Sequence, residues 1–120
     1  MRFIQELGFS VKVGKEEAHQ KWLIDNDKRI AQAQPKGTRY IGTFATVFSS
    51  EKSAGGYRSL FELDSYGAMD TAAALNKDPK SELGKVYREW SVFWDYDLAA
   101  PWSSTLMKDV NDVSLFDPKT

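Results

Sequence analysis

The stretch GTRYIGTFATVFSSEKSAGGYRSLFELDSY, residues 37–66, decides the fold of this 120-residue chain. Two segments in it, GTRYIGTFATVFSS and YRSLFELDSY, alternate between larger apolar side chains and small or polar ones. The segment between them, EKSAGG, is polar and ends in two glycines. Two alternating runs joined by a short glycine-bearing loop are typical of an antiparallel β-hairpin. The sequence therefore predicts a pair of neighbouring strands in the middle of the chain.

Helices and strands are predicted on both sides of this hairpin. A helix is expected over residues 15–34 and a longer helical region over 67–96, while strands are expected at 3–13 and 102–110. The resulting order, βαββαβ, predicts an α+β ferredoxin-like sandwich: a four-stranded antiparallel sheet with its helices on one face. We expect a single domain over residues 1–113 and a C-terminal tail over 114–120. Because this fold hosts many unrelated activities, the order alone does not give the function.

Alternation also predicts which side chains face the helices. In the first strand these are Phe3, Leu7, Phe9, Val11 and Val13. In the first strand of the hairpin, Ile41, Thr43 and Ala45 are expected to face the helices, and the aromatic residues Tyr40, Phe44 and Phe48 to face away. In the second helical region, Ser65 is expected to cap a first helix, and Asp78, followed by Pro79, a second one.

Composition limits the classes of function. Sixteen basic and seventeen acidic residues give a net charge of −1, without the basic excess that a nucleic-acid-binding protein usually shows. There is no cysteine, and no apolar run is long enough to cross a membrane. The N-terminus lacks the apolar core of a secretory signal. These observations predict a cytoplasmic protein with no nucleic-acid or membrane partner.

Aromatic content is high for so small a chain. Four Trp, five Tyr and seven Phe make up 13% of the residues. A single small sandwich rarely buries that many rings, so a second buried surface is expected. Ligand cavities and subunit interfaces both favour aromatic residues, and either would provide such a surface.

Three residues are candidates for catalysis. His19 is the only histidine and lies in the apolar stripe of the first helix, where it could act as a general base. The alternative is a core histidine whose hydrogen bonds are made to a backbone carbonyl or to Asn26. Arg58 and Glu62 share one face of the third strand and could hold an anionic oxygen and orient a substrate. The alternative for this pair is a cross-strand ion pair at a solvated edge.

Five further residues are candidates for binding a ligand, through rings, hydroxyls or an amide: Trp22, Asn26, Tyr40, Phe44 and Tyr66. For each of them, packing in the core or at a subunit contact is the alternative. The helical stripe formed by Tyr87, Trp90, Phe93 and Trp94 is interpreted as core. One histidine, no acidic ligand cluster and no phosphate-binding or dinucleotide motif argue against a metal or a cofactor.

The chain resembles the dimeric α/β-barrel superfamily, which contains antibiotic-biosynthesis monooxygenase, EthD-like, NIPSNAP-like and stress-responsive barrel domains. The resemblance covers residues 3–113 and is carried by PKGTRYIGTFATVFSS, YRSLFELDSYGAMD and FWDYD. It implies a homodimer in which two sheets meet face to face and close a barrel, with a cleft on the helix-free side of the sheet. Haem-degrading members use an Asn, a Trp and a His on particular strands and the second helix. Here the histidine is on the first helix and the first strand has no Asn, so haem chemistry is not implied.

Together these features predict a homodimeric barrel protein that binds a small, largely apolar organic molecule in the barrel cleft. Cofactor-independent isomerase, cyclase or monooxygenase chemistry is compatible with such a site, and whether the protein is an enzyme stays open. The alternative is a non-catalytic dimeric structural or interaction module whose barrel is filled by its own side chains.

Overall fold

The computed structural model describes residues 2–51, 56–97 and 102–110. Its elements follow one another as β1 (Phe3–Phe9), α1 (Glu16–Ala33), β2 (Thr38–Ala45), β3 (Tyr57–Leu63), α2 (Ala68–Lys77), α3 (Glu82–Ser91) and β4 (Trp102–Lys108). The predicted order is confirmed, with the second helical region divided into α2 and α3. The predicted tail over residues 114–120 lies outside the described residues.

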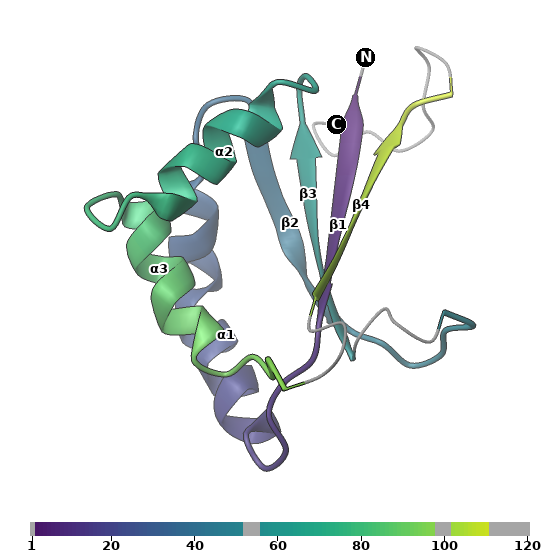
Figure 1. The fold of residues 1–120 in the computed structure, drawn as a ribbon, viewed down its shortest axis with the longest axis vertical. Helices are drawn as coiled ribbons and strands as arrows, with labels where there is room; N and C mark the ends of the chain where they lie inside the picture. The colour runs from purple at the N-terminus through teal and green to yellow at the C-terminus, as the bar shows by residue number, and fades with distance from the viewer. Residues whose placement is uncertain (1, 52–55, 98–101, 111–120) are drawn as a thin grey trace.

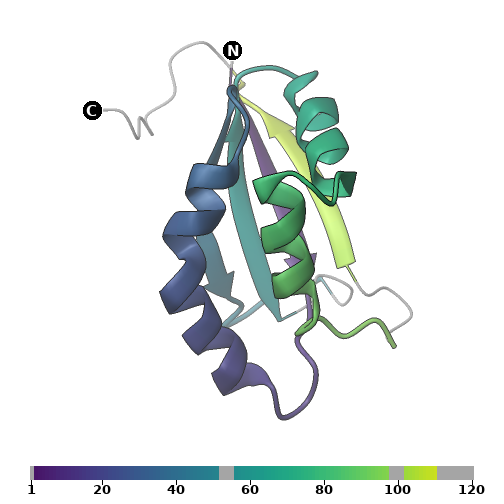
Figure 2. The ribbon, with the colours of Figure 1, turned by 90° about the vertical axis from the view of Figure 1, so that its left-hand side faces the viewer.

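The four strands form one antiparallel sheet in the order β2-β3-β1-β4. All three helices lie on the same face of this sheet, as Figure 1 shows from the edge and Figure 2 from the helical side. The predicted α+β ferredoxin-like fold is therefore confirmed. The opposite face, which no described helix covers, is called the open face below.

The core lies between the helices and the sheet, around Trp90 of α3. The Trp90 indole is fully buried; it stacks on Tyr87 with ring centroids 5.5 Å apart and meets the edge of Phe9 at the same distance. Burial of such apolar surface supplies most of the stabilisation of a domain of this kind. The buried apolar residues are Phe9, Val11, Ile30, Tyr40, Phe61, Leu63, Ala68, Leu83, Val86 and Trp90.

The start of α3 differs from the prediction. Ser81 is the N-cap, and its Oγ accepts a hydrogen bond from the backbone N–H of Gly84 at 2.9 Å. Asp78 instead ends α2, whose first residue follows Gly67, so the caps predicted at Ser65 and Asp78 are both wrong. A side chain at Gly84 would overlap the carbonyl oxygen of Asp78, which explains a glycine inside a helix.

The first strand is shorter than predicted. β1 ends at Phe9, and Val11 makes only an isolated bridge to Trp94. Val13 is 92% exposed, so it does not pack under the helices. The alternation of apolar and polar residues continues to Val13, but the strand ends at Phe9, where its pairing with β3 and β4 ends.

A β-bulge in β2 changes which side chains face the helices, so the predicted faces of this strand are wrong in part. Tyr40 pairs with Phe61 and Gly42 with Leu60, so Ile41 is an extra residue. Gly42 has φ +154°, a backbone conformation that side-chain-bearing residues rarely adopt. As a result Tyr40 faces the helices and is buried, although it was predicted to lie on the same side as Phe44.

Candidate functional site

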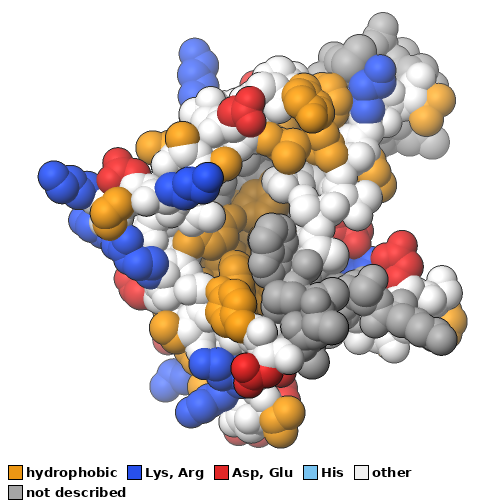
Figure 3. Space-filling model, in the orientation of Figure 1, with side chains coloured by type: hydrophobic (Ala, Val, Ile, Leu, Met, Phe, Trp, Pro, Cys, Tyr) orange, Lys and Arg blue, Asp and Glu red, His pale blue; other side chains and the backbone are white. Residues whose placement is uncertain are grey.

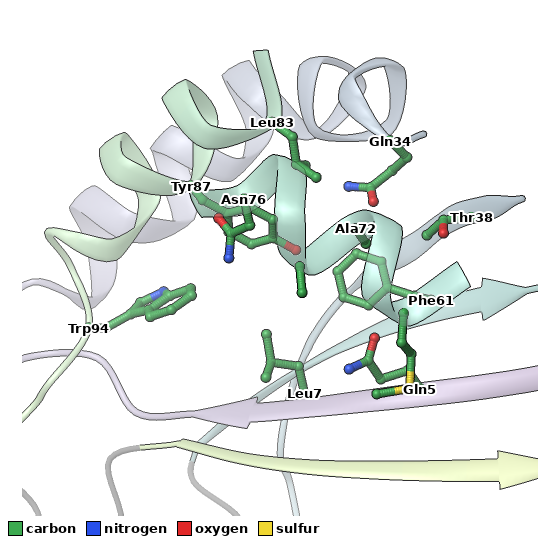
Figure 4. A pocket seen from close by; sticks show the side chains of 12 residues that line it. Gln5, Leu7, Gln34, Thr38, Phe61, Ala72, Asn76, Leu83, Tyr87 and Trp94 are labelled. Carbon is green, nitrogen blue, oxygen red and sulfur yellow. The ribbon is translucent and has the colours of Figure 1, made fainter. Parts of the chain in front are cut away.

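A pocket of about 370 Å³ lies between α2, α3 and the helix-facing side of the sheet. Figure 3 shows it as a hollow lined by hydrophobic side chains, and Figure 4 shows it from close by. Small-molecule sites have volumes of roughly 300–1,000 Å³, so this pocket is large enough for a small ligand. Its lining residues are Gln5, Leu7, Gln34, Thr38, Phe61, Met69, Ala72, Ala73, Asn76, Leu83, Tyr87 and Trp94.

Apolar side chains from both layers form most of the wall. Leu7 of β1 and Phe61 of β3 contribute from the sheet, and Leu83 contributes from α3 (Figure 4). On α2 the lining includes Ala72 and Ala73. Because these two side chains end at Cβ, α2 can cover the sheet without filling the space beneath it.

Six of the twelve lining residues carry a polar side-chain group, and two of these groups have no partner among the described residues. The amide of Gln5 donates to Ser104 Oγ at 3.2 Å, and that of Gln34 donates to the carbonyl of Ile30 at 3.1 Å. In contrast, Thr38 Oγ1 and Trp94 Nε1 are buried without a hydrogen-bond partner among the described residues. Buried polar atoms are normally hydrogen-bonded, so these two need an explanation such as a ligand or ordered water.

Tyr87 is the titratable residue of the lining. Burial raises the pKa of its phenol, and a hydrogen bond from Gln34 opposes this shift only in part. The phenol therefore stays protonated near neutral pH and can donate a hydrogen bond, but it cannot act as a base. Its ring is fixed by stacking on Trp90, with an interplanar angle of 14°.

His19 lies in the core and not in the pocket. Its ring is fully buried against Phe9 and Tyr57, with centroids 5.6 and 4.9 Å away. Its Nε2 accepts a hydrogen bond from Trp90 Nε1 at 3.0 Å, and burial lowers its pKa to about 4. The predicted partner Asn26 instead donates to the carbonyl of Trp22, at 2.9 Å. This geometry is that of a core histidine.

Arg58 and Glu62 do share a face of β3, as predicted, but that face is the open one. Arg58 Nη1 lies 2.6 Å from Glu6 Oε1, on the neighbouring strand. Glu62 lies 3.4 Å from Arg2 and 3.3 Å from Arg39. Each residue thus pairs with other strands and not with its predicted partner. The ion pairs are cross-strand, as in the alternative given above, but they do not lie at a solvated edge: β3 is an inner strand and Glu62 is buried.

The remaining predicted ligand residues do not share one cavity. Trp22 stacks on Trp90 under the helices, and the hydroxyl of Tyr40 donates to Asp27 of α1 at 2.8 Å. Phe44 is 51% exposed on the open face, and Tyr66 is 68% exposed at the start of the α2 region. The predicted constellation is therefore divided among the core, the open face and the surface.

Sequence reasoning missed the residues that line the pocket. Tyr87 and Trp94 were interpreted as core, since their helical spacing matches that of Trp90. One signal was available: the three alanines at 72–74 leave α2 without bulky side chains over a short stretch. The pocket itself depends on how α2 and α3 sit over the sheet, which local patterns do not encode.

The described residues contain neither a metal-binding cluster nor a membrane-spanning helix. Over residues 2–51, 56–97 and 102–110, no three His, Asp or Glu side chains come together as ligands for a metal ion. Within the same ranges, none of the helices combines the length and apolarity needed to cross a bilayer.

Comparison with solved structures identifies relatives of the fold. A NIPSNAP family protein from Agrobacterium tumefaciens str. C58 has a TM-score of 0.66 and 13% identity, over 97% of this chain and 100% of that one. A putative antibiotic biosynthesis monooxygenase from Deinococcus radiodurans has a TM-score of 0.52 and 18% identity, over 98% and 100%. A haem degrader from Mycobacterium tuberculosis, with two haems bound in its active site, has a TM-score of 0.50 and 14% identity, over 93% and 99%.

No family model and no curated protein matches the chain. The structural matches show that its fold is shared with NIPSNAP family proteins and with monooxygenase-like proteins. The resemblance noticed in the sequence is therefore confirmed at the level of the fold, without selecting one branch.

Proposed function

We propose that this protein binds a small, largely apolar organic molecule in the pocket between α2, α3 and the sheet, and that it does so as a homodimeric α/β barrel. The observation that carries the proposal is a mostly apolar pocket of about 370 Å³ whose lining includes two residues with unpartnered buried polar atoms, Thr38 and Trp94. A ligand with one or two hydrogen-bonding atoms on an apolar body matches this combination.

The open face is better suited to a second copy of the chain than to the ligand. It presents Phe44 and Met107, which are both exposed, beside two ion pairs, Arg39–Glu62 and Arg58–Glu6, that form within one protomer. A partner sheet placed here would cover apolar side chains without burying an unpaired charge. The ligand is therefore assigned to the helical side of the sheet, and the dimer contact to the open face.

Binding, and not catalysis, is the function that the lining supports. None of its described residues is Asp, Glu, His or Lys, so the proton transfers of an isomerase or cyclase have no base there. Tyr87 could orient a ligand carbonyl by donating a hydrogen bond. The fold relative from Mycobacterium tuberculosis binds haem, but His19 is enclosed in the core and offers no axial ligand to the pocket.

Fluorescence of N-phenyl-1-naphthylamine, a neutral apolar probe, tests the proposal. We expect emission to rise when the probe binds the wild-type protein. Ala72→Trp, which fills the pocket, should abolish this rise. Ala74→Trp is the matched control: it makes the same change two residues along α2, at an exposed position outside the lining, and should leave binding intact.

Two results would contradict the proposal. If the probe does not bind a folded wild-type protein, the non-catalytic structural module becomes the better description. If Ala72→Trp and Ala74→Trp bind the probe equally well, the ligand site is elsewhere. Circular dichroism of both variants distinguishes a filled pocket from an unfolded protein.

A further inference from the structure

A second, smaller hollow adjoins the pocket. It has a volume of about 210 Å³ and shares Asn76, Tyr87 and Trp94 with the main pocket. Figure 4 shows these three side chains together at one end of the main pocket. Beyond them, the smaller hollow is lined by Arg88, Ser91 and Tyr96. A ligand that passes between the shared residues would therefore reach Arg88.

Arg88 differs from the other four arginines of the chain. In the described structure Arg2, Arg29, Arg39 and Arg58 each lie within 4 Å of a carboxylate, and Arg88 does not. Its Nη2 donates to the backbone carbonyl of Pro79 at 2.7 Å, which holds the guanidinium in place. The other N–H groups of Arg88 make no hydrogen bond to the described residues, so they are available to a ligand.

Neighbouring carboxylates do not compete for this arginine. Glu89, the next residue, is bound at both oxygens by Arg29, at 2.7 and 2.6 Å. Glu82, at the start of α3, lies 3.3 Å from Lys85. Neither hollow has Asp or Glu among its described lining residues. A negatively charged ligand group in the smaller hollow would therefore lie near the unpaired guanidinium of Arg88, and no described lining residue would repel it.

We propose that the ligand is an apolar organic acid, with its apolar body in the main pocket and its carboxylate at Arg88. The inference rests on the proposed function, since it names the class of molecule that the same site takes. A guanidinium binds a carboxylate through two parallel hydrogen bonds, which gives both affinity and a fixed orientation. The amide of Asn76, at the junction of the two hollows, is placed to bind the same end of the ligand.

Displacement of N-phenyl-1-naphthylamine by two competitors tests the inference. The competitors are 2-naphthoate and 2-naphthamide, which share a ring system and differ in charge. We expect 2-naphthoate to bind the wild-type protein more tightly than 2-naphthamide. Arg88→Gln should weaken the binding of 2-naphthoate about tenfold, which is the usual effect of losing a charge-assisted hydrogen bond. It should change the affinity for 2-naphthamide less than twofold.

Lys77→Gln is the matched control, because it removes a positive charge from the end of α2, next to Asn76 but outside both linings. This variant should bind both competitors with the same affinity as the wild-type protein. Equal binding of the two competitors to the wild-type protein, or equal weakening of both by Arg88→Gln, would overturn the inference. In that case binding of the neutral probe still supports the proposed function. A probe that does not bind wild-type protein overturns both.

Discussion

Trp90 donates its indole N–H to Nε2 of His19 at 3.0 Å, and both side chains are fully buried. The bond requires a neutral imidazole that carries its proton on Nδ1. Protonation of Nε2 would break the bond and leave a charged ring against Phe9 and Tyr57, which cannot solvate it. The core is therefore built around one protonation state of its single histidine.

Stability is expected to fall in mild acid because of this histidine. The pKa of His19 is about 4 in the folded protein, against 6.5 for the free side chain. Between these values the unfolded chain takes up a proton that the folded protein does not. The contribution of neutral His19 to the free energy of unfolding is fully present above pH 6.5 and is lost as the pH falls towards 4, by about 3 kcal/mol in total.

Urea unfolding at pH 7 and pH 4.5 measures this loss. His19→Gln serves as the comparison, because its amide oxygen can accept the Trp90 hydrogen bond but does not titrate. Between pH 7 and pH 4.5, the free energy of unfolding of the wild-type protein should fall by about 2 kcal/mol more than that of His19→Gln. The same loss in both proteins would show that His19 is not the group that responds.

Gly84→Ala is expected to destabilise the protein, although alanine is the better helix former. A Cβ at this position would overlap the carbonyl oxygen of Asp78 and displace the Ser81 cap. We expect a loss of about 2–3 kcal/mol in free energy of unfolding, as for other overpacked sites. Gly67→Ala is the control, since no described atom lies within 4 Å of its added Cβ. Equal stability of the two variants in urea would contradict this account of α3.

Phe44→Asp is expected to break the proposed dimer. Phe44 is half exposed on the open face, opposite Arg58, whose charge is already paired with Glu6, so a second carboxylate there would be desolvated by the partner sheet without a guanidinium of its own. Sedimentation velocity at micromolar concentration should give a dimer for the wild-type protein and a monomer for this variant. Ile24→Asp, at an exposed position on α1, should remain dimeric. A monomeric wild-type protein would contradict the proposed assembly.

The hairpin and the order of elements could be predicted because alternation and turn residues are local. The prediction that Arg58 and Glu62 share one face of β3 is confirmed by the register of that strand. Alternation failed in β2, where one extra residue at Ile41 moves Tyr40 to the other face. Gly42 was the visible sign of this irregularity, since glycine inside a strand often marks a bulge.

The site could not be predicted for a different reason. Its lining comes from β1, the end of α1, β2, β3, α2, α3 and the segment after α3, which are far apart in the sequence. None of these residues carries a chemical signature. The residues that do, His19 and Glu62, lie in the core and on the open face, where Trp90 donates to Nε2 of His19 and Arg39 pairs with Glu62. The titratable residues that the sequence singled out therefore lie outside the pocket, whereas the pocket is lined by residues with no chemical signature.

The most direct test is a titration of ¹⁵N-labelled protein with 2-naphthol, followed by ¹H–¹⁵N correlation spectra. Ligand binding in the pocket should move the indole N–H signal of Trp94 and the amide signals of Ala72, Asn76 and Tyr87, and leave Phe44 and Arg58 unchanged. Shifts centred on Phe44 and Arg58 would instead place the ligand on the open face. That result, or no shift at all, would contradict the claim that the pocket beneath α2 and α3 is the binding site.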